Sequence, residues 1–279
     1  MIFAATTVLA RLTTVSAPVL VTWRCLLSFL GAFAWVALMR DRRIWLGWWQ
    51  VAVLLGVGAI IGLHWLCLFG AVKIANVSIA LAGLATLSLF TAFTEPLLMR
   101  RRIQPFEVFL GLIVLAGIGL IAGAETDHLL GLGIALLSAL LAAIFLVLNR
   151  IIVVKGGDPM VMVGWEMVSA AGLCFLAIPL FDPRGFGGLP ITEPWDWVWI
   201  AILAFGCTVF AQALTIRLLL RISAYRLNLV ANFEPVYGII AAAIIFREYA
   251  NLTTTFYIGA SAIVLANFLH PWLQRRYGV

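Results

Sequence analysis

The feature that most constrains this chain is a succession of long apolar runs separated by short clusters of charged and turn-forming residues. Lys, Arg, Asp and Glu make up 11% of its 279 residues, against roughly 25% in an average soluble domain. A soluble fold cannot bury that much apolar surface, so the sequence predicts an integral membrane protein. A membrane-spanning helix needs about 20 apolar residues, and ten such spans leave no room for a soluble domain.

Ten segments are predicted to be helices, because an open strand cannot satisfy its backbone groups in lipid. They are residues 1–14, 17–39, 46–71, 75–99, 104–124, 129–152, 159–181, 197–220, 223–246 and 253–272. The first segment is short for a full crossing. It lacks a basic n-region and an A-x-A-like cleavage site, so we interpret it as a shortened first helix rather than a signal peptide. The fold class is an all-α polytopic membrane protein.

The basic residues gather on alternate loops. Thirteen of the 18 follow an even-numbered segment or lie at the C-terminus: Arg40, Arg42, Arg43, Arg100, Arg101, Arg102, Arg150, Lys155, Arg217, Arg221, Arg226, Arg275 and Arg276. Because cytoplasmic loops carry an excess of Lys and Arg, we expect both termini in the cytoplasm and the chain in a bacterial inner membrane. The same bias explains the net charge of +6, so no nucleic-acid partner is expected. The expected partners are the lipid bilayer and a small metabolite, and a homodimer is left open.

The two halves of the chain carry a weak internal repeat. Residues 76–92 align with residues 223–239 at a shift of 147 positions. Five spans in each half is an odd number, so the halves must insert with opposite topology. The sequence therefore predicts two inverted five-helix repeats, residues 1–124 and 125–279. Inverted repeats that face each other are typical of alternating-access carriers.

The chain resembles the EamA family of the drug/metabolite transporter superfamily. The residues that carry the resemblance are the apolar runs that end in charged turns, the Phe233-Glu234-Pro235-Val236 stretch and the Phe246-Arg247-Glu248 span end. The resemblance covers essentially the whole chain. It implies ten helices around a central cavity, with export of amino acids or other small metabolites as a common activity.

Four charged residues are predicted to lie at bilayer depth: Arg24, Glu95, Glu166 and Glu234. A charge at bilayer depth costs roughly 2.5–3.5 kcal/mol, so each is a candidate for a substrate or proton pathway. Alternatives remain open for each of them. Arg24 either extends toward the outer interface or pairs with Glu234, and Glu95 is close enough in sequence to pair with Arg100. Glu166 either lines an inner vestibule or forms a structural pair.

The segment 223–246 combines several polar groups with a proline. Asn228 and Asn232 are four residues apart and share a helix face, and Glu234 precedes Pro235. A proline removes a helical hydrogen bond and kinks the helix, so we interpret Pro235 as a hinge. Its counterpart in the fourth segment is Pro96, which follows Glu95. Amides beside a carboxylate suit an amphoteric or cationic solute or a proton, although asparagines also join helices to one another in membranes.

His64 and Trp65 complete the candidate site residues. Both lie late in the third predicted helix, where they either line the cavity or pack between helices. Two pairs of small residues, Gly58 with Gly62 and Gly119 with Gly123, are predicted to be helix-packing surfaces. The four cysteines lie in apolar runs and are predicted to be free thiols.

These features favour a secondary transporter, with export as the expected direction and Glu234 as the candidate for proton coupling. An enzyme is not expected, because all five aspartates lie in loops or at span ends and the chain has neither an H-E-x-x-H nor a P-loop motif. Neither a metal nor a cofactor is expected. A channel or receptor without coupled transport remains the alternative.

Overall fold

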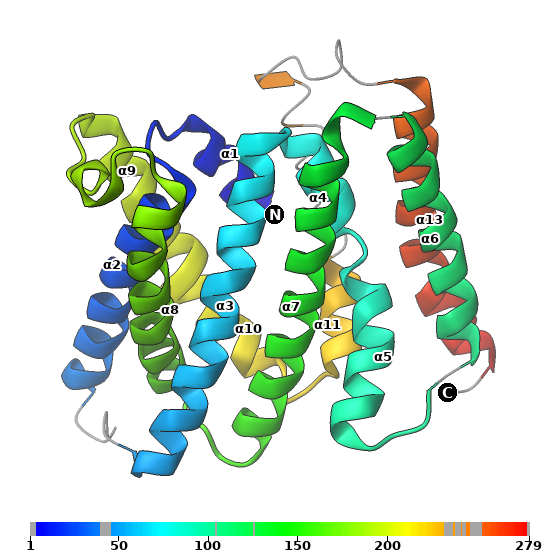
Figure 1. The fold of residues 1–279 in the computed structure, drawn as a ribbon. Coiled ribbons are helices and arrows are strands. Elements are labelled where there is room, and N and C mark those ends of the chain that lie inside the picture. The colour runs from blue at the N-terminus through cyan, green and yellow to red at the C-terminus, as the bar shows by residue number, and fades with distance from the viewer. Residues whose placement is uncertain are drawn as a thin grey trace.

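The computed structural model describes residues 4–39, 46–103, 105–124, 126–231, 237, 241, 244–245 and 253–277, and this part of the chain contains helices and no strands (Figure 1). In chain order the α-helices are α1 (Ala4–Leu12), α2 (Ala17–Leu38), α3 (Trp48–Ile74), α4 (Val77–Leu84), α5 (Leu87–Met99), α6 (Pro105–Ala124), α7 (Leu129–Val154), α8 (Pro159–Phe181), α9 (Pro194–Ala201), α10 (Ala211–Leu218), α11 (Ala224–Ala231) and α13 (Thr254–Tyr277). Short 3₁₀ turns occupy Thr126–His128 and Gly185–Gly188.

The described helices follow the predicted segments closely, with two interruptions that the sequence did not indicate. The fourth segment is divided at Ala85 and Thr86 into α4 and α5, whereas α5 continues through Pro96. The eighth segment contains a π-helical stretch, Ile202–Phe210, between α9 and α10. Only the first part of the ninth segment, α11, is among the described helices.

Six helical stretches of the described chain are long and apolar enough to cross a membrane. They are Ala17–Leu38, Trp48–Ile74, Val77–Met99, Thr126–Val154, Pro159–Phe181 and Pro194–Leu218. Their outward faces carry large apolar side chains such as Leu38, Leu97 and Leu180, each about four-fifths exposed. An apolar surface of this extent is unfavourable in water, so it indicates contact with lipid. The four cysteines are free thiols, as predicted.

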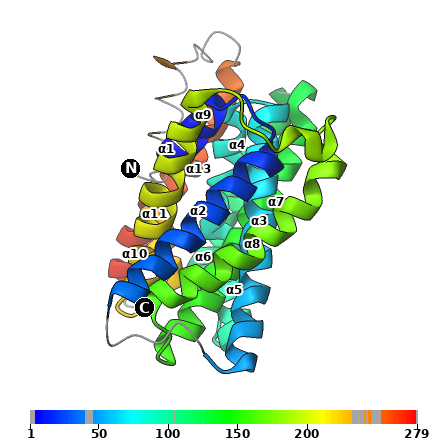
Figure 2. The same cartoon turned by 90° about the vertical axis from the view of Figure 1, so that its left-hand side faces the viewer.

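The long helices pack side by side, in antiparallel pairs such as α2 with α8 and in parallel pairs such as α3 with α8 (Figures 1 and 2). α2 lies along α8, α6 lies along α13, and α3 lies between α7 and α8. The contact of α3 with α8 depends on the first predicted glycine pair. A Cβ at Gly58 would collide with the backbone of Glu166, and one at Gly62 would lie 3.0 Å from the Cα of Ala170. Small residues allow this close approach, so the prediction for Gly58 and Gly62 is confirmed.

The second glycine pair does not pack in this way. Gly119 and Gly123 are exposed, and no other described atom lies within 4 Å of a Cβ built at either position. The face of α6 that packs against α13 is instead the one carrying Gly117 and Ile121, which meet Gly259. The prediction of a packing surface at Gly119 and Gly123 is therefore wrong for the described part of the chain. The pattern identifies residues that permit close packing, but it does not say which face has a neighbour.

The two ends of the bundle differ in charge. The lower end in Figure 1 holds the turns after α5, α7 and α10, at residues 100–103, 155–158 and 219–223. We call it the arginine-rich end, because Arg100, Arg101, Arg102, Arg221 and Arg226 are exposed there. The opposite end holds residues 13–16, 126–128 and 182–193, including the buried carboxylate of Asp182.

Candidate functional site

A cavity of about 90 Å³ lies inside the bundle, where residues from α1 to α5 meet residues from α7, α10 and α11. We call it the central cavity. Its wall is apolar over most of its area, with Leu68, Leu84, Leu87, Ala142, Phe145, Leu146, Leu227 and Ala231. The remaining lining residues bring polar groups: Thr6, Arg24, His64, Trp65, Gln212, Thr215 and Asn228. Four of the predicted site residues, Arg24, His64, Trp65 and Asn228, are thus brought together.

Arg24 is the cationic group of this wall. Its side chain is 1% exposed and points into the bundle, so it does not extend toward the membrane interface. Nε donates a hydrogen bond to Thr208 Oγ1 at 2.8 Å, and the guanidinium carbon lies 4.0 Å from the centre of the Trp65 ring and 5.5 Å from that of Phe69. A cation over an aromatic face is stabilised by the ring quadrupole. Trp65 and Phe69 therefore help α3 to hold this charge beside the cavity.

The π-helical stretch explains how Thr208 reaches Arg24. The Thr208 hydroxyl donates to the carbonyl of Leu203, five residues earlier, at 2.8 Å and accepts the bond from Arg24. A π-helix widens the turn and often occurs at functional sites.

His64 joins α3 to α7. Its Nδ1 lies 2.9 Å from the carbonyl oxygen and 2.8 Å from the hydroxyl oxygen of Ser138, and the Ser138 hydroxyl is 3.0 Å from the His64 carbonyl oxygen. The ring also lies against Phe145, with 5.5 Å between the ring centroids. These contacts fix the imidazole in one orientation at the edge of the cavity.

Two amides add hydrogen-bonding groups. The Asn228 amide nitrogen donates to Thr91 Oγ1 at 2.6 Å, which connects α11 to α5. The Gln212 amide nitrogen is buried and has no hydrogen-bond partner among the described residues. A buried donor without a partner costs free energy, so Gln212 offers a hydrogen bond to a molecule in the cavity.

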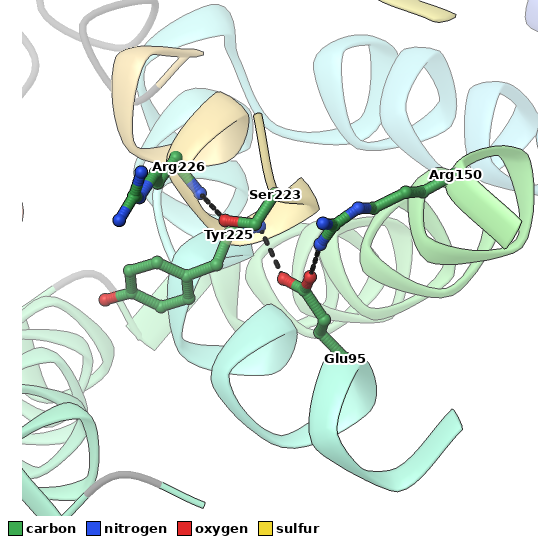
Figure 3. A network of polar contacts seen from close by, with 5 residues as sticks. All are labelled: Glu95, Arg150, Ser223, Tyr225 and Arg226. Carbon is green, nitrogen blue, oxygen red and sulfur yellow. Dashed lines mark hydrogen bonds and ion pairs between the residues drawn. The ribbon is translucent and has the colours of Figure 1, made fainter. Parts of the chain in front are cut away.

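Glu95 does not line the central cavity. Figure 3 shows its carboxylate between two helices, where it forms an ion pair with the Arg150 guanidinium of α7 and accepts a hydrogen bond of 2.8 Å from the backbone N–H of Tyr225 in α11. The partner is therefore an arginine of another helix, whereas the alternative considered from the sequence was Arg100. Pro96, the next residue, is buried within α5.

Glu166 also lies away from the cavity lining, on the face of α8 that meets α3. The residue is fully buried, and neither its carboxyl oxygens nor the side-chain amide of Asn149 on α7 forms a hydrogen bond within the described residues. The other candidates in the ninth segment, Asn232, Glu234 and the hinge candidate Pro235, lie outside the described residues.

The sequence matches the model of the EamA-like transporter family in two stretches, residues 1–123 and 129–269, which together cover nearly the whole chain. The chain belongs to the EamA-like transporter family. The resemblance inferred from the sequence is therefore confirmed. Membership in the EamA family, together with the apolar helices, identifies an integral membrane protein from a family of small-molecule transporters, which are generally not enzymes.

The fold itself has a solved counterpart. A solved structure titled only "Crystal structure of protein" matches with a TM-score of 0.69, 18% sequence identity, and coverage of 99% of this chain and 97% of its own. At that identity the likeness shows the fold alone. No curated protein matches the chain.

Sequence reasoning missed several residues of this EamA-family cavity. Gln212 and Thr215 line the cavity, and Thr208 holds Arg24 beside it. All three are neutral, whereas the cost of a charge in the membrane singles out only charged residues. The spacing of Gln212 and Thr215, three residues apart inside an apolar segment, was the available signal, because that spacing places both side chains on one helix face. Within the described residues, no group of three or more His, Cys, Asp or Glu side chains could hold a metal ion.

Hydrogen bonds to two buried aspartates fasten the end opposite the arginine-rich one. Asp196 accepts from the backbone N–H and the hydroxyl of Thr14, at 3.1 and 2.6 Å, and Asp182 accepts from the Ser16 hydroxyl at 2.6 Å. Burial of the Asp182 carboxyl alone would raise its pKa, but the hydrogen bonds from Ser16 and Arg184 and the charge of Arg184 outweigh burial and lower that pKa. These contacts tie the turn between α1 and α2 to the end of α8, through Asp182, and to α9, through Asp196.

Proposed function

We propose that this chain is a secondary transporter that carries small metabolites by alternating access, with the solute held in the central cavity. The proposal rests on which parts of the chain supply the residues that line the central cavity. Arg24, His64 and Trp65 come from the first of the two family-matched stretches, and Gln212, Thr215 and Asn228 come from the second. Carriers built from two repeats bind their solutes at the repeat interface.

The packing of the helices supports an inverted arrangement of residues 1–124 and 125–279. In such an arrangement the second span corresponds to the seventh, and the fifth to the tenth. These are the pairs α2 with α8 and α6 with α13, and each helix packs lengthwise against its counterpart. When two repeats are related by a twofold axis, a helix can pack lengthwise against its counterpart only close to that axis.

The lining favours solutes that carry a hydrogen-bond acceptor and an apolar part. Arg24 supplies a positive charge, Gln212 supplies an amide donor, and the leucines and Phe145 supply apolar contact. Amino acids and other small carboxylates have this combination. With the arginine-rich end in the cytoplasm, as the distribution of basic residues favours, we propose export as the direction. Glu234 remains our candidate for proton coupling.

The test is counterflow of radiolabelled amino acids into proteoliposomes. Saturable exchange is expected from the wild type. Arg24→Gln should reduce the rate about tenfold, because a hydrogen bond to a charged group is lost, and Arg102→Gln, at an exposed arginine, is the control. Glu234→Gln should abolish uptake driven by a proton gradient while counterflow persists, with the exposed Glu193→Gln as its control. Flux that does not saturate would instead indicate a channel.

A further inference from the structure

Three helices that line the central cavity converge again at the arginine-rich end. On α5, Leu87 lines the cavity and Glu95 lies two turns further toward that end. On α7, Phe145 and Leu146 line the cavity and Arg150 lies about one turn beyond them. On α11, Leu227 and Asn228 line the cavity, and Tyr225 precedes them. The Glu95 carboxylate thus lies between the cavity and the arginine-rich end, on the same three helices.

Local chemistry explains why a carboxylate is favoured at this point. The first N–H groups of a helix have no partner within the helix and carry a partial positive charge. In α11, the Ser223 hydroxyl accepts from the N–H of Arg226 at 3.1 Å, and Glu95 accepts from the N–H of Tyr225. Arg150 adds a full positive charge on the other side (Figure 3). One carboxylate therefore caps α11 and binds α7 at the same time.

A second hydrogen bond joins α5 to α11 one turn nearer to the cavity. Thr91 and Glu95 are four residues apart on α5 and share a face. Thr91 accepts the bond from Asn228, which is itself a cavity-lining residue. Two successive hydrogen bonds therefore join α5 to α11. The acceptor of the bond nearer to the arginine-rich end, Glu95, also engages α7.

We propose that Glu95, Arg150 and the amino end of α11 form the gate that closes the central cavity toward the arginine-rich end. The inference rests on the proposed function, since a gate matters only if a solute passes. The pair is largely buried in this closed state, with the side chains of Glu95 and Arg150 7% and 15% exposed. Both residues lie in the last turns of their helices, α5 and α7, at the arginine-rich end, where water can solvate the separated charges once the helices part. Such a pair can break and form again during a transport cycle. Glu95 is then a positioning residue that does not touch the solute.

The test measures access to the cavity and needs no substrate. A cysteine is introduced at the cavity-lining Ala142, in a chain whose four native cysteines are replaced by alanine, and a membrane-impermeant maleimide is applied from the arginine-rich end. Glu95→Gln and Arg150→Gln should each raise the labelling rate about tenfold, the change expected from the loss of one charge-assisted hydrogen bond. Arg226→Gln is the matched control, because it removes the same charge at the same end while its exposed side chain points away from Glu95 (Figure 3).

A reference cysteine at the exposed Ile103 should label at one rate in every variant. Unchanged labelling of the Ala142 cysteine in both gate variants, with normal labelling at Ile103, would overturn the gate. If Glu95→Gln does not give a monodisperse protein, Arg150→Gln decides alone, because it leaves the cap on α11 in place. If labelling rises as expected but the wild type exchanges no solute, the gate stands and the proposed transport function fails.

Discussion

Asp182 shows how one residue can fasten two loops and make the fold sensitive to pH. Its carboxylate accepts from Ser16 and Arg184, and Gly188 approaches so closely that a Cβ there would lie 2.5 Å from the carboxylate oxygen. We expect Asp182→Asn to lower the stability by about 2 kcal/mol at pH 7, because hydrogen bonds to a charged acceptor are lost. Thermal melts of the purified protein measure the change, with the exposed Asp127→Asn as the control.

The pH dependence follows from the lowered pKa of Asp182. A carboxyl whose pKa is lower in the folded state stabilises the fold fully above the unfolded value, and this contribution is lost as the pH falls through the folded value. The ordinary pKa is 3.8, so the difference between wild type and Asp182→Asn should be constant from pH 7 to about 5 and shrink below about pH 4. A difference that stayed constant down to pH 3 would contradict this assignment.

At the same scale, the sequence predicted site residues unevenly. Arg24 and Glu95 could be identified from the sequence, because a charged residue inside an apolar span is costly in free energy. The partners of these two residues could not be identified from the sequence. Arg24 contacts Thr208, which is 184 positions away, and Glu95 contacts Arg150, which is 55 positions away. Such pairs depend on how the helices pack, which one sequence read by itself does not determine.

At the scale of helices, the contact of α3 with α8 rests on Gly58. A side chain there meets backbone atoms of Glu166, which cannot rotate away. Gly58→Ala should therefore force the two helices apart and lower the stability by about 1–3 kcal/mol. Gly56→Ala is a matched control on the same helix, because Gly56 is exposed and no other described atom lies within 4 Å of its Cβ position. Melting temperatures in detergent should fall only for Gly58→Ala, and an equal fall in both would disprove the contact.

The helices themselves were the most predictable feature, because apolar length and charged turns are local properties. The interruptions within the predicted helices could not be predicted from the sequence. The break at Ala85 and Thr86 contains no proline, and Thr86 bonds through its hydroxyl to the Gly83 carbonyl. The π-helical stretch around Thr208 likewise has an ordinary apolar sequence, so its geometry reflects tertiary contacts such as the bond from Arg24.

At the scale of the whole molecule, the distribution of charge predicts the orientation in the membrane. The arginine-rich end exposes Arg100, Arg101, Arg102, Arg221 and Arg226, whereas the Lys and Arg residues described at the opposite end are Arg11, Lys73 and Arg184. Because basic loops are retained in the cytoplasm, a reporter fused after Arg102 or Arg276 should be cytoplasmic, and one fused after His128 or Gly187 should be outside. Alkaline phosphatase, active only outside, and green fluorescent protein, fluorescent only inside, should give opposite signals at each site. A full reversal of the signals would place the Glu95 gate on the outer face and remove the basis for export. Equal signals from the His128 and Arg102 fusions would disprove an odd number of membrane crossings between those two positions.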